Sequence, residues 1–358
     1  MTEKIKQDNL AENAIDKMHT FDIFTEKEFK TGFLNIIIRG SKDNTYKFAL
    51  ARFLIDYSME KTETHVEFST IAKYFLRYYW PQICKLKMKH APQTNKQPEI
   101  VRIIEKEFPK NCYPETFKKA CRKYPENMER CIKQIVAKCF HNVIWRFQRM
   151  KMGRATQVRL FFDYEIKREI HSNKKLVDLD YGINLNPEAM KFFKRHDVFL
   201  LKAVILEWAK FLEKLNDKLP KIIVKTEGLN KKRGGLTKFR KALEPICNQC
   251  FYCKEDLPEG RQRQVEHVIP FDYIAEDDIW NLTLVCQKCN LQKLGSLPPW
   301  EYIEKLIERN RDFKTEIDGL EKSLNDLNQD FGEMIKQHYD NAKAHGYLAM
   351  KKFQCSQS

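Results

Sequence analysis

Four cysteines in the C-terminal half of the chain stand in two Cys-x2-Cys pairs, Cys250 with Cys253 and Cys286 with Cys289. Four thiolates at this spacing are typical of a closed tetrahedral Zn2+ site that stabilises a fold. Cys247 precedes Cys250 by three positions, so "CNQCFYC" also offers a second pairing. We expect Cys250 and Cys253 to be the ligands, because the aromatic residue between them and the "KEDL" after them suit a zinc knuckle that leads into a strand.

Four polar residues in the same segment, Glu266, His267, Asn281 and Asn290, are not needed by a zinc knuckle. A neutral imidazole at His267 can take a proton from water near pH 7, and the Asn281 side chain can hold the backbone that carries it. The oxygens of Glu266 and Asn290 are ligands that Mg2+ or Mn2+ prefers. One such ion and a histidine base could hydrolyse a phosphodiester bond. The alternative for His267 is a structural histidine beside the knuckle.

The stretch "VEHVIP … WNLTLVCQKCNLQK" resembles the HNH (ββα-metal) endonuclease family over residues 247–300. In that family an acidic residue and a histidine end a β-strand, a loop with an asparagine follows, and a short helix supplies the last metal ligand. The resemblance is to zinc-knuckle members with Asn in the third motif position, and it implies phosphodiester hydrolysis. Two positions depart from the commonest pattern: Glu266 stands where Asp is frequent, and Asn290 where His is frequent.

The 358-residue chain carries a net charge of +15, which favours a nucleic-acid partner. Lys231, Lys232 and Arg233, just before the nuclease-like segment, are the best candidates for phosphate contacts, and Lys293, one helical turn after Asn290, is another. Two further basic clusters are "KLKMKH" and "RFQRMKMGRATQVR". A solvated basic surface is the alternative for each of these groups. DNA is the expected substrate, and RNA stays open because a metal site that contacts phosphate does not itself exclude ribose.

The N-terminal 20 residues contain no apolar segment of the signal-peptide kind, and no apolar run approaches 18 residues. We therefore expect no membrane association and a cytoplasmic protein with reduced thiols, in which cysteines serve as metal ligands or buried side chains.

The apolar periodicity predicts a mainly α, multidomain protein. We expect a helical N-terminal domain for recognition or regulation, then two short strands with a long helix, then the zinc-stapled ββα-metal nuclease domain, and finally a helical extension. The predicted strands are 156–166 and 176–185, and the long helix begins after an Asn186 cap and runs from 187 to 215. The four domains are expected at residues 1–155, 156–227, 228–300 and 301–358.

Apolar residues in the extension repeat at alternating steps of three and four between residues 303 and 334, a heptad pattern interrupted only at Asn310. Such a helix could pair with a second copy or with a partner protein, and a polar residue at one seam position can set the register. The alternative is an amphipathic helix that folds back on its own protein. Gly319 and Gly332 weaken an isolated coiled coil, by about 1 kcal/mol each.

Three functions therefore stand open at the level of sequence. The first is a DNA endonuclease with a single divalent metal ion and a histidine base, suited by analogy to bacterial or phage restriction or defence. The second is a catalytically inactive, zinc-stabilised nucleic-acid-binding protein. The third is an assembly protein that works through its heptad helix. One active site makes one nick, so a double-strand break would need two copies.

Overall fold

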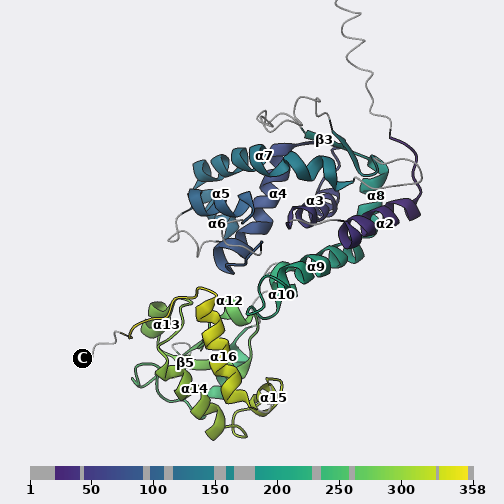
Figure 1. Ribbon diagram of the computed structural model, residues 1–358. Helices are drawn as coiled ribbons and strands as arrows, with labels where there is room; N and C mark the ends of the chain where they lie inside the picture. The colour runs from purple at the N-terminus through teal and green to yellow at the C-terminus, as the bar shows by residue number, and fades with distance from the viewer. Residues whose placement is uncertain are drawn as a thin grey trace, which may run out of the picture. The chain divides into compact units, whose positions relative to one another are not determined.

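The computed structural model describes residues 21–40, 44–91, 97–108, 116–148, 159–164, 182–227, 235–257, 263–327 and 330–353. The chain forms two compact units (Figure 1). The first consists of Met1–Trp80 with His90–Phe211, and the second of Pro81–Lys89 with Leu212–Ser358. The fold is mostly helical, as the periodicity predicted.

The first unit packs helices around a small sheet. Its strands pair antiparallel in the order β1-β3-β2, with Val66 opposite Ile183 and Asp163 opposite Asn184. Large aromatic side chains fill the core, and Phe48 stacks on Trp208 with ring centroids 6.2 Å apart. Its elements are α2 (Glu26–Leu34), the π-helical turn η1 (Asn35–Arg39), α3 (Tyr46–Glu60), β1 (His65–Glu67), α4 (Phe68–Trp80), α5 (Glu99–Glu107), α6 (Phe117–Lys123), α7 (Pro125–Phe147), β2 (Phe162–Tyr164), β3 (Gly182–Leu185), α8 (Pro187–Arg195) and α9 (Asp197–Glu213).

Both predicted strands are present as shorter elements, β2 and β3, and parts of each predicted range lie outside the described residues. Strand β1 was not predicted, because three residues between two helices carry too little pattern. Asn186 caps α8 as expected, since its side chain accepts a hydrogen bond from the Glu188 amide. The single long helix from 187 to 215 is wrong: α8 ends at Arg195, and α9 begins at Asp197.

The second unit contains two antiparallel strands followed by a helix. Strand β4 (Gln264–His267) pairs with β5 (Leu282–Val285), placing Glu266 opposite Thr283 and His267 opposite Leu282. Helix α13 (Gln287–Lys293) follows β5 directly. The remaining elements are the π-helical turn η2 (Pro81–Lys85), α10 (Ile222–Glu227), α11 (Thr237–Leu243), α12 (Phe271–Ile274), the 3-10 turn η6 (Ile279–Asn281), α14 (Glu301–Asp312), α15 (Leu320–Asn325) and α16 (Phe331–Ala344). The strand–strand–helix order is the one that the ββα resemblance implied.

The expected continuous heptad helix between residues 303 and 334 is wrong. The segment forms α14, α15 and the start of α16, and Gly319 has a left-handed φ of 77° that precedes α15. Seam residues such as Ile303, Leu306 and Leu324 are buried. The structure therefore favours the alternative, in which the amphipathic pattern packs against its own unit.

Segment 81–89 belongs to the second unit through specific contacts. Lys85 forms a 2.7 Å ion pair with Asp272, and the Leu86 carbonyl accepts a 2.7 Å hydrogen bond from His345. Lys87 donates to the Gly346 carbonyl. These contacts occupy two lysines of the "KLKMKH" cluster within the fold. Separately, in the part of the chain that the structure describes, no helix is long and apolar enough to span a bilayer.

Candidate metal centre and catalytic site

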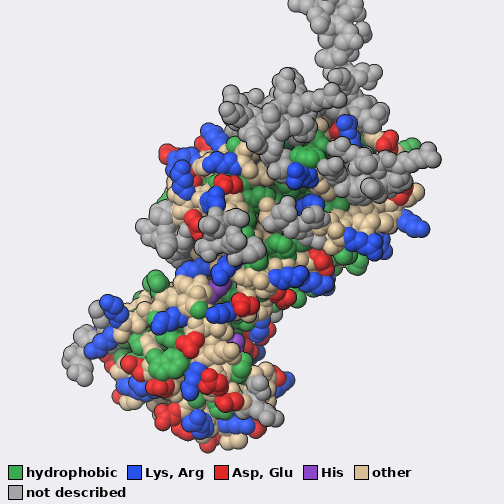
Figure 2. All heavy atoms as spheres, in the orientation of Figure 1, with side chains coloured by type: hydrophobic (Ala, Val, Ile, Leu, Met, Phe, Trp, Pro, Cys, Tyr) green, Lys and Arg blue, Asp and Glu red, His purple; other side chains and the backbone are tan. Residues whose placement is uncertain are grey.

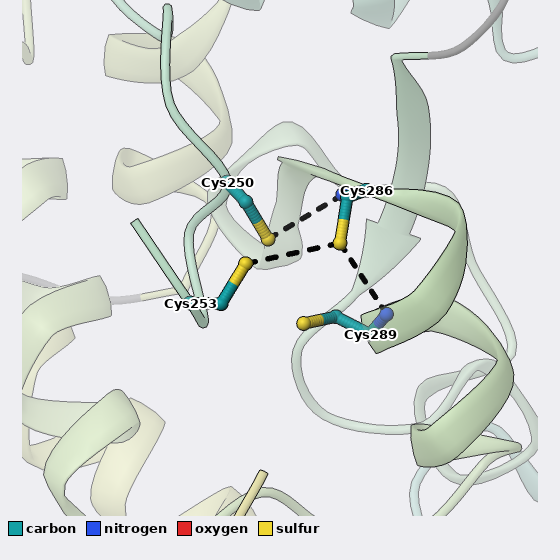
Figure 3. A group of neighbouring side chains, drawn as sticks. All are labelled: Cys250, Cys253, Cys286 and Cys289. Carbon is teal, nitrogen blue, oxygen red and sulfur yellow. Dashed lines mark hydrogen bonds between the residues drawn. The ribbon is translucent and has the colours of Figure 1, made fainter. Parts of the chain in front are cut away.

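The four cysteines of the two pairs converge on one point (Figure 3). Their Sγ atoms all lie within 4.8 Å of one another, and Cys253 Sγ is 3.8 Å from Cys286 Sγ. A tetrahedron with zinc–sulfur bonds of about 2.3 Å has sulfur–sulfur edges of about 3.8 Å, so the geometry fits Zn2+. Among the described residues, the group that could hold a metal contains Cys250 and Cys253 and does not include Cys247.

Local backbone geometry explains how the cysteines meet. The Cys250 amide donates to the Glu255 carbonyl, which closes the first knuckle into a tight loop. Cys286 is the N-cap of α13, and its Sγ accepts from the Cys289 amide at 3.4 Å. The Phe251 amide donates to the Leu284 carbonyl at 3.0 Å, which ties the knuckle to β5. A metal ion bound by these thiolates would join the knuckle loop to the β5–α13 junction.

His267 is the last residue of β4, and only 3% of its surface is exposed. Its Nε2 lies 3.0 Å from Oδ1 of Asp277. Because a carboxylate only accepts hydrogen bonds, Nε2 is the donor in this contact, and a neutral ring in this arrangement has its lone pair at Nδ1. The ring also packs edge-on against Phe271, with centroids 5.2 Å apart. The pair is thus a histidine whose tautomer is fixed by a carboxylate.

Asn281 holds the backbone that follows His267. Its side-chain oxygen accepts from the Ile269 amide at 2.8 Å, and its amide nitrogen donates to the Ile269 carbonyl at 2.8 Å. Its own carbonyl accepts from the Val268 amide at 2.9 Å. Asn281 is fully buried, so both polar atoms of its side chain are satisfied by one residue. This is the contact expected of an orienting asparagine.

Glu266 and Asn290 lie on the neighbouring elements β4 and α13. Lys293 donates to Glu266 Oε1 at 2.9 Å and to the His267 carbonyl at 2.7 Å, and the Asn290 amide nitrogen donates to the Gln264 side chain. One Glu266 oxygen therefore accepts a hydrogen bond from Lys293. The amide oxygen of Asn290 is of the ligand type that hard divalent cations prefer. The donor types fit Mg2+ or Mn2+, with a lysine already beside the carboxylate.

Lys293 is not placed as a phosphate contact. The side chain is fully buried and donates to Glu266 and to the His267 carbonyl. Burial lowers the pKa of Lys293, and the Glu266 carboxylate acts in the opposite direction. The expectation at this position needs correction, because an ammonium enclosed in this way supports β4 rather than facing a ligand.

The other expected phosphate contacts, Lys231, Lys232 and Arg233, lie outside the described residues, as does most of the cluster from 146 to 159. Helix α11, which begins at Thr237 and packs on β4 and β5, brings Lys238 and Lys241 to the exposed surface near the site. On the face drawn in Figure 2, the described Lys and Arg side chains stand among carboxylates rather than in one continuous stripe.

Comparison with known proteins bears on both parts of the chain. Residues 31–228, more than half of its length, match the family described as "Domain of unknown function (DUF8808)". The chain belongs to the DUF8808 family. Residues 243–294 match the HNH endonuclease family, a segment that contains both cysteine pairs and the His267 site, and this confirms the resemblance seen in the sequence. No curated protein matches the chain, and no solved structure matches it.

The HNH match gives the DUF8808 protein a nuclease-type module over a short segment, and the cysteine group gives that module a metal-binding centre. The candidate site residue that the sequence did not reveal is Asp277, which contacts the His267 ring. It stands in an acidic run, "EDD" at 276–278, where a solvated surface is the ordinary interpretation. Asp277 also lines a cleft of about 320 Å3 between α11, residues 277–279 and α15.

Proposed function

We propose that this DUF8808 protein is a metal-dependent endonuclease that hydrolyses DNA phosphodiester bonds with His267 as general base. The observation that carries the proposal is the His267–Asp277 pair, at 3.0 Å, within an HNH-matched ββα unit. A buried structural histidine can give its N–H to any acceptor. A carboxylate partner suits a histidine base in particular, because it orients the ring and stabilises the imidazolium that forms.

The residues divide the reaction as follows. Nδ1 of His267 takes a proton from a water molecule, whose oxygen forms a bond to phosphorus while the bond from phosphorus to the 3′-oxygen breaks. Asp277 stabilises the imidazolium that forms, and the departing oxygen takes a proton from solvent. Asn281 keeps His267 at the end of β4 through Ile269. A bound Mg2+ or Mn2+ supplies charge relief at the phosphate, and Glu266 and Asn290 are the residues that would hold it.

Zn2+ at Cys250, Cys253, Cys286 and Cys289 is structural in this proposal. Four protein thiolates leave no open coordination position, so this metal takes no direct part in hydrolysis. Its sulfur ligands instead fix the start of α13, the helix that carries Asn290. The proposal thus includes two metal ions. Zinc stabilises the fold, and a second ion, bound by oxygen ligands, takes part in hydrolysis.

DNA is the proposed substrate on the strength of the HNH match and the net charge of +15. Lys231, Lys232 and Arg233 remain proposed phosphate contacts, and RNA remains an alternative substrate. A role in bacterial or phage restriction or defence stays part of the proposal, as does pairing with a second copy. The burial of the heptad seam lends no support to pairing through residues 303–334.

A second candidate is favoured by one observation, the ion pair between Lys293 and Glu266. An ammonium can neutralise a carboxylate that would otherwise bind the metal. The chain would then be a zinc-stabilised nucleic-acid-binding protein without catalytic activity.

Incubation of the full chain with supercoiled plasmid separates the two candidates. The endonuclease converts plasmid to nicked or linear forms with Mg2+ or Mn2+ and not with EDTA. A parallel reaction with structured RNA of similar length reports the substrate class. Plasmid retardation without cleavage under every metal would favour the inactive candidate.

A further inference from the structure

Three donors from helix α14 hold the carbonyls on either side of Asn281. Arg309 Nη1 donates to the Leu282 carbonyl at 2.9 Å, and Nη2 donates to the Trp280 carbonyl at 3.1 Å. Asn310 Nδ2 donates to the same Trp280 carbonyl at 2.9 Å. Arg309 is 9% exposed and Asn310 is fully buried. Both residues lie beyond the HNH match, which ends at residue 294.

The segment that α14 holds supplies both contacts to the candidate base. Asp277 bonds the His267 ring, and Asn281 bonds the backbone of Ile269, two residues after His267. The Asn281 amide donates to the Asp278 carbonyl at 2.9 Å, so these contacts come from one closed turn. A shift of Trp280 would therefore move the ring contact and the backbone contact together.

The polar character of Arg309 and Asn310 is not explained by packing. Nε of Arg309 and Oδ1 of Asn310 have no hydrogen-bond partner among the described residues. Burial keeps water from the Arg309 guanidinium and lowers its pKa to about 10. Apolar residues of similar volume would fill this space without desolvating a charge. The three hydrogen bonds to the backbone of 280–282 are what these two side chains provide.

The other C-terminal helices support the same turn. The Trp280 ring stacks on His338 of α16, with centroids 5.9 Å apart and an interplanar angle of 17°. Helix α15 packs against η6, the turn that contains Trp280 and Asn281. Helix α14 thus donates hydrogen bonds to the Trp280 backbone, and α16 contacts the Trp280 ring. Helix α15 packs against the η6 turn that contains this residue.

We propose that Arg309 and Asn310 are positioning residues for the His267 site, so that the helices after residue 300 are a working part of the catalytic module. They act through the 277–281 turn and touch no substrate. This inference rests on the proposed function, because it assigns the position of a base that the proposal names. It also replaces the coiled-coil role that the sequence suggested for Asn310.

The test compares full-length Arg309→Met and Asn310→Leu with Arg311→Met, which removes an exposed charge from the same helix. Hydrogen exchange at the amides of residues 267–269 measures positioning directly, because the Val268 and Ile269 amides donate to Asn281. We expect Arg309→Met to exchange about tenfold faster there, because local opening of the turn becomes easier. Amides of Cys286 and Cys289 and the zinc content serve as the measure of an intact fold, and Arg311→Met should match the wild type throughout.

Cleavage kinetics give the second readout. Arg309→Met should lower kcat about tenfold while KM for plasmid stays within about twofold, since the contact orients a base and binds no DNA. Added guanidinium ion should restore part of kcat in Arg309→Ala, which leaves a cavity for the ion, and none in Asn310→Leu. Where Arg309→Met loses zinc or unfolds, Arg309→Lys, which keeps one donor, takes its place with a smaller effect of the same kind.

Unchanged exchange at residues 267–269 in a zinc-loaded Arg309 variant would overturn the inference. So would an equal increase of exchange throughout the second unit, because that would indicate stability alone. If the wild type cleaves nothing, the proposed function fails, and the exchange comparison still decides whether α14 positions the His267 segment.

Discussion

At the scale of single residues, His267 depends on a carboxylate that lies ten positions further along the chain. Glu276 and Asp278, on either side of Asp277, both form ion pairs with Lys221. Only Asp277 of the three bonds the imidazole. Two residues of the acidic run, Glu276 and Asp278, thus pair with Lys221, and the third, Asp277, contacts the candidate base.

Replacing Asp277 by Asn tests this division. The variant keeps the shape but loses the charge that stabilises an imidazolium, so kcat for plasmid nicking should fall by about 10- to 100-fold. KM should hardly change, because Asp277 binds the base and not the DNA. Asp312→Asn, at an exposed position of α14, is the matched control. Equal kcat in Asp277→Asn and wild type would remove Asp277 from the mechanism.

Lys293 gives a prediction about stability rather than DNA binding. Lys293→Met leaves Glu266 beside an apolar side chain in a largely buried setting, at a cost of about 3 kcal/mol in the unfolding free energy. The salt dependence of DNA binding should not change, since no phosphate contact is lost. Lys288→Met, at an exposed position of the same helix, should leave stability unaltered. A reduced salt slope in Lys293→Met with normal stability would restore the phosphate contact.

Much of the candidate site could be read from residue types and spacing. The two cysteine pairs predicted their own convergence, and the order of Glu266, His267 and Asn281 fitted one nuclease family. Lys293 was misjudged although the sequence held a signal: it follows the buried Cys289 by four positions, so both lie on the inward face of α13. Asp277 carried no such signal, because only the path of the 268–281 loop brings it to the histidine.

At the scale of elements, the C-terminal extension shows where periodicity stops being informative. Apolar residues at steps of three and four fit one long helix or three short ones equally well. Gly319, in the left-handed conformation, separates α14 from α15, and the pattern continues across the break. A helix that pairs with another chain and a helix that packs on its own core show the same apolar periodicity in the sequence. Only the tertiary contacts distinguish the two.

The zinc knuckle can be tested by replacing a single cysteine ligand. Cys289 is fully buried, so Cys289→Ser should lower the zinc content from about one ion per chain to near zero. The start of α13 should then lose protection from hydrogen exchange. Cys247→Ser should keep its zinc, because Cys247 lies outside the metal group. Zinc loss in Cys247→Ser instead would favour the other pairing.

At the scale of the whole molecule, the two regions that match families differ in how well their families could be recognised from the sequence. The HNH segment could be recognised because its chemistry demands particular residues at fixed places. The DUF8808 match over 31–228 could not, because helical periodicity with an aromatic core fits many folds. Strands β2 and β3 were found where β-forming residues cluster, whereas β1 was missed. The break at His196 was also missed, because apolar residues continue on both sides.

The first unit contains a buried histidine that should make it sensitive to acid. His90 lies beside the Tyr79 ring, 5.1 Å between centroids, and burial lowers the pKa of His90 from 6.5 to about 3. Between these two values the unfolded chain binds a proton that the folded chain refuses. Stability is therefore complete above pH 6.5 and is lost as pH falls, by ~2 kcal/mol from pH 7 to pH 5.

Urea titrations at pH 7 and pH 5 measure this loss in the wild type and in His90→Gln. The variant lacks the titrating group, so its stability should depend less on pH by the same amount. His65→Gln, at an exposed position of the same unit, is the control. An identical pH dependence in wild type and His90→Gln would show that other groups govern acid sensitivity.

The proposed function makes His267 the base of a metal-dependent DNA hydrolase. The most direct test is the single-turnover nicking rate of supercoiled plasmid with Mg2+, for wild type and His267→Ala, at protein concentrations that saturate binding for both. We predict that His267→Ala binds plasmid and keeps its zinc while its nicking rate falls by at least about 100-fold. Equal rates for the two proteins would contradict it, and would place the base elsewhere.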